Sequence, residues 1–341
     1  MAKIRFDLKP FDSPRTGWYS FFDSIQDLFQ LMAGHPPGAV YTREDDMAAK
    51  KKETALLEHV DAVKKGKRAF EDAFQGVSRM ILDAGIQKIT VKGKSTYQFN
   101  LFSQGNKHLV GMYDEINSFV SFVKDASEGG SSREMAFVLV GEPGNGKTFF
   151  VEYLCDRYRE FLSTPENRKF TFRFIHLDQL GGYGQIQSIE SQTYEDPMIL
   201  AMSLETTKNA SMEFLAEKFK FSDRQIESIY TKYRPLGACS AYIWNQIREF
   251  CDNKIDKMLS FVDVAPVPLI ESLGTITGKY PAKDKITSSA VDLIGEESIQ
   301  RLLHITDTNN PYRFDLRRGA LARVAGGGIH FADEIYRSEE R

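Results

Sequence analysis

Hydrophobic and polar positions divide the chain into a helix-rich first part and a later part in which strands and helices alternate. Between residues 47 and 86, apolar side chains recur at spacings of three and four among Ala, Lys, Glu and Leu, which predicts amphipathic helices. Another amphipathic helix is predicted over residues 110–124, ahead of Gly129 and Gly130. Residues 1–45 show no sustained period and are predicted to form an arm or a loosely attached segment.

The later part begins with a strand–helix–strand pattern. Residues 135–140 are predicted to form a short, fully apolar strand, residues 147–161 a helix, and residues 171–177 the next strand. From about residue 185 to 310 the pattern is largely helical, with an interruption at residues 262–270. A last apolar strand is predicted at residues 328–332, directly before the acidic pair Asp333 and Glu334.

A phosphate-binding motif joins the first predicted strand to its helix. The pattern G-x-x-x-x-G-K-[ST] is matched by Gly141, Glu142, Pro143, Gly144, Asn145, Gly146, Lys147 and Thr148. Its glycines let successive backbone N–H groups point inward as an anion nest, and the helix that follows presents its positive N-terminus to the same phosphates. Lys147 would supply positive charge to the β- and γ-phosphates, and the Thr148 hydroxyl would ligate Mg²⁺. The motif therefore predicts a nucleotide phosphate site.

The acidic pair supplies a candidate second half of that site. Asp333 would help to hold Mg²⁺, and Glu334 would orient and deprotonate the attacking water. His330, which alternates with apolar neighbours, is interpreted as a structural histidine. Because Lys147 and Asp333 lie 186 positions apart, where a helix, a strand and a second helix need roughly 50 residues, a large helical insertion is predicted between the second strand and the acidic strand.

Composition narrows the class of protein. With 42% hydrophobic residues the chain can bury a core, and a net charge of −3 with a pI near 6.1 gives no general electrostatic reason to bind nucleic acid. The three cysteines show neither CxxC nor Cys/His metal spacing, which disfavours a disulfide scaffold and a zinc finger. No stretch approaches the length of a membrane span, and no signal peptide is visible. We therefore expect a soluble, cytoplasmic protein.

The phosphate loop, with its proline, resembles that of the AAA+ branch of P-loop ATPases, as do Val110 and Gly111 ahead of the next helix. The stretch 102–337 more closely resembles the N-terminal AAA+ module of the PrkA family, called serine protein kinases. The likeness rests on the segments 109–112, 141–148, 195–200, 319–323 and 328–331. It covers about two-thirds of the chain, and residues 1–100 match only loosely.

This resemblance implies an α/β P-loop NTPase fold of AAA+ type, a parallel sheet flanked by helices. Residues 1–100 would be an N-terminal arm and helical extension, and residues 101–341 the AAA+ module, with its insertion at about 185–312. It also implies ATP and Mg²⁺ as ligands, Val110 and Gly111 among the nucleotide-binding residues, and a homo-oligomeric ring. PrkA proteins continue with a kinase-like region, and AAA+ modules place further strands and sensor residues later, so an incomplete module is expected.

Three functions remain open at this stage. The first is Mg-dependent ATP hydrolysis that couples nucleotide state to a protein partner or substrate, with Lys147 and Glu334 as the catalytic residues. The second is the protein serine/threonine kinase activity that the family name implies, although no HRDxxxxN or DFG motif occurs. The third is passive nucleotide binding without turnover.

Two further features have alternative interpretations. The segment 181–184 (GGYG) lies where AAA+ unfoldases carry an aromatic pore loop, but the sequence favours a turn with one surface tyrosine. An arginine cluster before the last strand would contact phosphate or a neighbouring subunit, or would form a solvated or salt-bridged face. It consists of Arg313, Arg317, Arg318 and Arg323.

Overall fold

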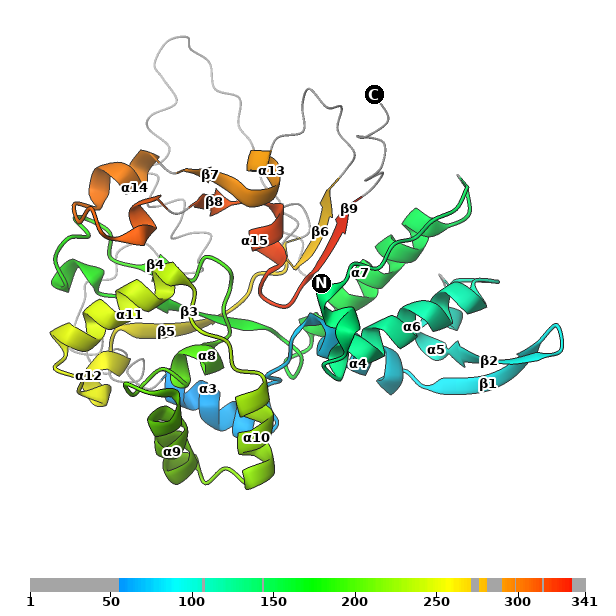
Figure 1. The fold of residues 1–341 in the computed structure, drawn as a ribbon, viewed down its shortest axis with the longest axis horizontal. Helices are drawn as coiled ribbons and strands as arrows, with labels where there is room; N and C mark the ends of the chain where they lie inside the picture. Colours follow the sequence, from blue (N-terminus) through cyan, green and yellow to red (C-terminus); the bar gives the residue numbers. More distant parts are fainter. Residues whose placement is uncertain are drawn as a thin grey trace, which may run out of the picture. The chain divides into compact units, whose positions relative to one another are not determined.

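The computed structural model is a mixed α/β protein with many helices and several small sheets (Figure 1). It describes residues 55–105, 108–142, 144–270, 276–280, 290–297, 299–314 and 316–332. All of these belong to one compact unit, Ala49–Arg341. The predicted arm at residues 1–45 lies outside the described residues.

Helices and strands alternate irregularly along the described chain. The helices are α3 (Ala55–Lys64), α4 (Ala73–Asp83), α5 (Asn100–Ser103), α6 (Tyr113–Ser127), α7 (Lys147–Ser163), α8 (Pro197–Ala201), α9 (Lys208–Phe219), α10 (Asp223–Thr231), α11 (Ala238–Phe250), α12 (Ile255–Leu259), α13 (Ala290–Ile294), α14 (Ile299–His304) and α15 (Ala320–Val324). The strands are β1 (Ile86–Val91), β2 (Lys94–Phe99), β3 (Phe170–Phe174), β4 (Ile189–Glu190), β5 (Val262–Pro266), β6 (Thr277–Tyr280), β7 (Gly295–Glu297), β8 (Leu316–Arg318) and β9 (Ile329–Ala332).

The strands form four small sheets. β1 and β2 make an antiparallel hairpin, β3 lies between β4 and β5 with antiparallel pairing to both, and β7 pairs antiparallel with β8. Within the described ranges, parallel pairing occurs between β6 and β9, in the register that sets Thr277 opposite Ile329 and Tyr280 opposite Ala332 (Figure 1). The described sheets are thus mostly antiparallel, unlike the parallel sheet that was expected.

The prediction of a strand directly before the phosphate loop is wrong. Residues 135–140 are assigned to no strand, and no described backbone pairs with them. Their side chains still alternate: Phe137 and Leu139 pack on the core, whereas Val138 and Val140 are 51% and 87% exposed. Side chains that alternate between two faces are typical of a strand. A strand in a sheet also needs a neighbouring backbone that pairs with its N–H and C=O groups.

The other local predictions are largely confirmed. The helix predicted at 147–161 is α7, the strand predicted at 171–177 is β3, and the last apolar strand is β9. The helix predicted from residue 110 begins at Tyr113, because Gly111 has φ of +80° and cannot belong to a right-handed helix. The interruption at 262–270 contains β5, whose pairing with β3 joins the predicted insertion to the second predicted strand.

Two hydrophobic clusters form the core. The first is built on β3 and β5 with apolar residues of α3, α8 and α11, among them the fully buried Trp244, whose indole N–H donates to the Ser203 carbonyl oxygen. The second holds the buried faces of α4, α6 and α7. In it Phe150 of α7 lies 5.7 Å from Phe102 and 5.3 Å from Phe119, ring centre to ring centre. This aromatic packing fixes the helix that begins at the phosphate loop.

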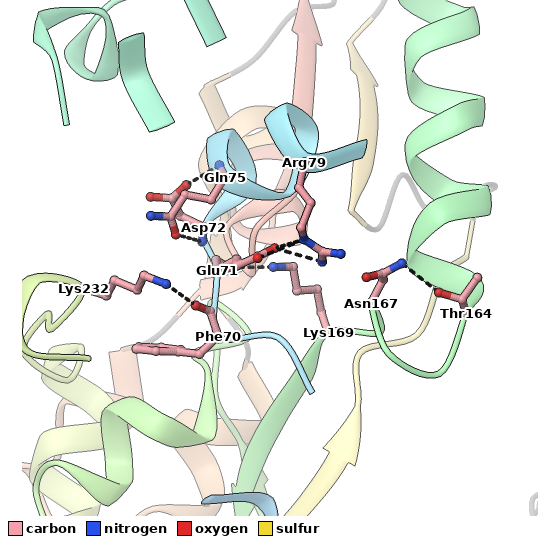
Figure 2. A network of polar contacts seen from close by, with 9 residues as sticks. All are labelled: Phe70, Glu71, Asp72, Gln75, Arg79, Thr164, Asn167, Lys169 and Lys232. Carbon is pink, nitrogen blue, oxygen red and sulfur yellow. Dashed lines mark hydrogen bonds and ion pairs between the residues drawn. The ribbon is translucent and has the colours of Figure 1, made fainter. Parts of the chain in front are cut away.

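The segment from residue 65 to 72, between α3 and α4, is held by two lysines from distant parts of the chain and by an arginine of α4 (Figure 2). Lys232 donates to the Phe70 carbonyl oxygen at 2.9 Å, and Lys169 donates to that of Glu71 at 2.6 Å. Arg79 binds both carboxylate oxygens of Glu71. Burial lowers the pKa of Lys169, and the contact with Glu71 supplies a partner that a buried ammonium group needs.

Candidate functional site

The phosphate loop turns sharply into the first residue of α7. Gly144 and Gly146 have φ of +87° and +78°, a left-handed conformation that residues with a Cβ rarely adopt. α7 begins at Lys147, directly after Gly146, and the Phe150 N–H donates to the Gly146 carbonyl oxygen at 2.9 Å. The backbone N–H groups of the first helical turn therefore have no partner within the helix.

The Lys147 side chain folds back over the loop. Its ammonium nitrogen donates to the carbonyl oxygens of Gly141 and Glu142, each at 2.7 Å. An ammonium group has three protons, so these two bonds leave one donor for another acceptor. The arrangement places the positive charge of Lys147 beside the positive N-terminus of α7, and the charge and the helix dipole together favour an anion at this point.

The remaining loop residues are accessible. Glu142, Asn145 and Thr148 are exposed, and the Asn145 N–H donates to the Glu142 carbonyl oxygen at 3.4 Å. Thr148 lies in the first turn of α7, so its hydroxyl is available to a ligand of the loop. Pro143 lies outside the described residues.

The segment ahead of α6 lies against the phosphate loop. A Cβ on Gly146 would lie 3.6 Å from the Met112 sulfur. Gly111 and Met112 also line a hollow that is closed on other sides by β2 and α5. Val110 is 76% exposed and does not line this hollow. Of the predicted pair Val110 and Gly111, the structure thus brings Gly111 to a concave surface near the loop.

The predicted acidic residues Asp333 and Glu334 lie outside the described residues, but the strand that leads to them is described. The Tyr158 hydroxyl of α7 donates to the Gly327 carbonyl oxygen at 2.8 Å, just before β9. Arg159 donates to the Thr277 hydroxyl at 2.6 Å, at the first residue of β6. Two neighbouring residues of α7 therefore hold the amino ends of both parallel strands.

The faces of β9 differ in their environment. Ile329 and Phe331 pack on the same hydrophobic cluster as α7, while His330, between them, belongs to the opposite face. Burial lowers the pKa of the half-buried His330 imidazole, which favours its neutral form. This environment agrees with the interpretation of His330 as a structural residue.

Tyr183 corrects both interpretations of the segment 181–184. Its side chain is 1% exposed, packs in the first hydrophobic cluster, and donates its hydroxyl hydrogen to Gln246 of α11. Burial raises the pKa of the Tyr183 hydroxyl. Tyr183 is therefore neither an aromatic of a pore loop nor a surface tyrosine, because its ring fills core volume that the local sequence does not reveal.

Arg318 confirms the salt-bridged alternative for one member of the arginine cluster. Its guanidinium group donates to Glu190 at 2.6 Å, to the Tyr194 hydroxyl at 2.9 Å and to two backbone carbonyl oxygens, and it lies over the Tyr194 ring. The four hydrogen bonds use four of the five N–H donors of the guanidinium group. Arg318 thus connects β8 to β4 and to the residues that follow it.

Sequence reasoning overlooked the carboxylate of Glu195. It accepts hydrogen bonds from the Ser191 hydroxyl at 2.7 Å, the Ser240 hydroxyl at 2.5 Å and the Gly237 N–H at 2.7 Å. Gly237 is the N-cap of α11, so Glu195 accepts the backbone N–H of the residue at which this helix starts. A partner 42 positions away leaves no local signal in the sequence.

The described ranges contain no group of three or more His, Cys, Asp or Glu residues placed to hold a metal ion, and Asp333 lies outside these ranges. No described helix is both long and apolar enough to cross a membrane. Cys155, Cys239 and Cys251, all among the described residues, form no disulfide bond.

Comparison with known proteins adds no relative. No protein-family model matches the chain, and neither the curated proteins nor the solved structures contain a significant match. The resemblance to PrkA proteins therefore rests only on the sequence segments given above. A function has to be argued from the chemistry of the phosphate loop.

Proposed function

We propose that this chain binds ATP and hydrolyses it with Mg²⁺, as a P-loop module of AAA+ type similar to the N-terminal module of PrkA proteins. In this proposal, nucleotide state is coupled to a protein partner. The observation that carries it is the loop at the start of α7, with Gly144 and Gly146 in left-handed conformations and the Lys147 ammonium group folded over it.

Phosphate recognition follows from that geometry. The loop and the first turn of α7 supply backbone N–H donors, and the helix dipole adds positive potential at the same point. Lys147 adds a full charge, and a γ-phosphate would accept its third proton or replace one of its two carbonyl contacts. Backbone donors and a mobile cation together suit a polyphosphate better than a carboxylate, since several anionic oxygens need partners.

The donor set fits magnesium. The exposed Thr148 hydroxyl and the Asp333 carboxylate are hard oxygen ligands of the kind that Mg²⁺ prefers, and the bound ion would neutralise phosphate charge. Glu334 would orient the attacking water and accept its proton. Lys147 would bind the β- and γ-phosphates and stabilise the charge that develops during transfer.

The packing of α7 supports an arrangement of this type. Tyr158 and Arg159, both in the C-terminal half of α7, hold the amino ends of β9 and β6. β9 then packs its apolar face on the core shared with α7. A strand that starts beside the C-terminal half of the helix and runs antiparallel to it would deliver Asp333 and Glu334 toward the phosphate loop, as in α/β folds that bind ligands at the carboxyl ends of strands.

Nucleotide binding is tested by thermal melting of the whole chain with and without Mg-ATP and Mg-ADP. Ligand at 100 times its dissociation constant should stabilise the fold by about 2.7 kcal/mol. The shift should vanish in Lys147→Ala and persist in Lys124→Ala, which replaces an exposed lysine on α6. Equal shifts in the two variants would contradict the assignment of the loop.

Hydrolysis is tested separately with Glu334→Gln. Release of phosphate should be abolished while the ATP-induced melting shift is retained, because the amide cannot accept the proton of water. Retention of the wild-type rate would rule out the role of Glu334, and absence of turnover in both proteins would indicate passive binding. Radioactive γ-phosphate supplied in the same reactions distinguishes hydrolysis from kinase activity by whether label appears on protein.

A further inference from the structure

The β1–β2 hairpin lies in a stretch of the chain that is devoid of acidic side chains. Residues 84–113 contain no Asp or Glu, although a chain with 47 acidic residues among 341 would carry about four in that length. The hairpin itself carries Lys88, Lys92 and Lys94. All three are exposed, and no ion pair of theirs occurs within the described ranges. The hairpin is therefore a local cationic surface on a chain of net charge −3.

The turn of the hairpin defines which backbone groups face outward. Lys92 and Gly93 have φ of +50° and +79°, the conformation of a two-residue type I′ turn, and Val91 is opposite Lys94. The two residues that flank such a turn are hydrogen-bonded to each other through both backbone groups. Along the hairpin, hydrogen-bonded pairs then alternate with pairs whose backbone groups point outward. Lys88 and Thr90 consequently direct their N–H and C=O groups away from β2.

The two outer edges of the hairpin differ. On β2 the outward carbonyl oxygen of Tyr97 accepts a hydrogen bond from the Asn117 side chain of α6 at 2.8 Å, so this edge is covered there. On β1 the sheet ends, and no described strand pairs with its outer edge. Figure 1 shows the hairpin as two long arrows with no further strand beside them. The open edge of β1 is thus a template for one more strand.

The side chains beside this edge are suited to an acidic segment. Lys88 is directly opposite Tyr97, which is 51% exposed, and the next pair toward the turn on the same face is Thr90 with Ser95. A strand added to β1 would place its own side chains next to Lys88 and Thr90 on one face. A carboxylate beside Lys88 would be paired with its ammonium group, and Lys92 would extend the positive charge to the turn.

The base of the hairpin is attached to the phosphate-loop helix. Phe99 is buried in the second hydrophobic cluster, and the Phe102 ring that follows stacks on Phe150 of α7. The Tyr153 hydroxyl of α7 donates to the Leu101 carbonyl oxygen at 2.6 Å. A segment bound to the hairpin is therefore connected by direct contacts to the helix that starts at Lys147.

We propose that the outer edge of β1 binds an extended, acidic segment of a partner protein by strand addition. Backbone hydrogen bonds to Lys88 and Thr90 provide affinity, and carboxylates beside the lysines provide specificity. A protein segment fits better than nucleic acid, because three lysines without an arginine and a negative net charge supply little of the electrostatic attraction that a nucleic-acid backbone requires.

The test uses a fluorescein-labelled peptide in which Glu alternates with Val and Thr, added to the whole chain without nucleotide and followed by fluorescence anisotropy. Two matched peptides have Lys in place of Glu, or the same sequence with alternate backbone nitrogens methylated. We expect binding of the acidic peptide, weakening as salt screens the lysines, and at least tenfold weaker binding of both matched peptides.

The protein variants separate charge at the hairpin from charge in general. A triple variant that combines Lys88→Glu, Lys92→Glu and Lys94→Glu should bind the acidic peptide at least tenfold more weakly than the wild type. The same net change made at Lys124, Lys218 and Lys254 should leave its affinity within about twofold, since screening limits attraction from distant surface charges. Melting curves of both triple variants establish that each is folded.

Several outcomes would overturn the proposal: no binding of the acidic peptide, equal binding of the methylated peptide, or binding of a dT20 oligonucleotide in place of the peptide. Lys147→Ala should bind the acidic peptide as the wild type does, because the assay contains no nucleotide. Absence of an ATP-induced melting shift in the wild type, with peptide binding retained, would contradict the proposed ATPase alone.

Discussion

Two short apolar runs adjoin the predicted nucleotide site, and they have different fates in the fold. Residues 136–140 (AFVLV) precede the phosphate loop and residues 329–332 (IHFA) precede the acidic pair. The second run becomes β9, which pairs in parallel with β6 over four residues. The first alternates between partly buried and exposed positions but pairs with no described strand. Apolar composition is thus shared by the two runs, whereas pairing is not.

The difference shows that a strand is defined by its neighbour. β9 meets β6 because Gly328 lets the two backbones approach: a Cβ there would lie 2.1 Å from the Ile276 carbonyl oxygen. The Ile329 N–H then donates to that same oxygen at 2.7 Å. Residues 136–140 present equally suitable side chains, but no described backbone offers the hydrogen bonds that would complete a ladder.

The largest expected effect comes from closing the approach that β9 needs. Gly328→Val should lower the free energy of unfolding by about 3 kcal/mol, because its Cβ meets backbone that cannot move aside without separating β6 from β9. Urea unfolding measures the loss. Gly237→Ala is the control, because its Cβ would lie 3.6 Å from the nearest atom, a Glu195 carboxylate oxygen. It should lower the free energy of unfolding by less than about 1 kcal/mol. Equal losses at the two positions would contradict the assigned β6–β9 contact.

The run before the phosphate loop is examined by truncating neighbouring side chains. Leu139→Ala should cost about 1.5 kcal/mol, because Leu139 packs on the second cluster, while Val140→Ala should stay within about 0.5 kcal/mol. Unfolding curves of the two variants give the comparison. Losses above 1 kcal/mol at both positions would mean that both faces are buried, as in the central strand of a parallel sheet.

The link between α7 and β9 gives a smaller effect. Tyr158→Phe should destabilise the fold by about 1 kcal/mol, because the Gly327 carbonyl oxygen loses its donor in a buried place. Tyr97→Phe, at an exposed ring, serves as the matched control and should be neutral within about 0.3 kcal/mol. If Tyr158→Phe also weakens the melting shift with Mg-ATP, the hydrogen bond positions β9 for the nucleotide.

The smallest effect concerns pH. Burial lowers the pKa of His330 below its ordinary value of 6.5, so the unfolded chain binds a proton more readily than the folded chain. The contribution of His330 to stability is complete above pH 6.5 and is lost as the pH falls below that value. His330→Gln should therefore flatten the decline in unfolding free energy on the acidic side of pH 6.5. An unchanged slope in His330→Gln would contradict the effect of burial on this imidazole.

The sequence determined the features that depend on local chemistry. α7 follows from its composition and from hydrogen bonds within the helix, and its start at Lys147 follows from Gly146, whose conformation excludes an earlier start. The order of the loop residues and the apolar character of β9 could also be predicted. The resemblance to PrkA proteins and the ATPase remain predictions.

The tertiary structure alone decided which segments meet. It left residues 136–140 without a described ladder, buried Tyr183 against α11, and committed Arg318 to Glu190 and Tyr194. Each of these outcomes depends on a partner between 50 and 130 positions away, or on the absence of one among the described residues. Periodicity reports the environment that a side chain prefers, whereas strand pairing and burial are determined by the backbone that arrives beside it.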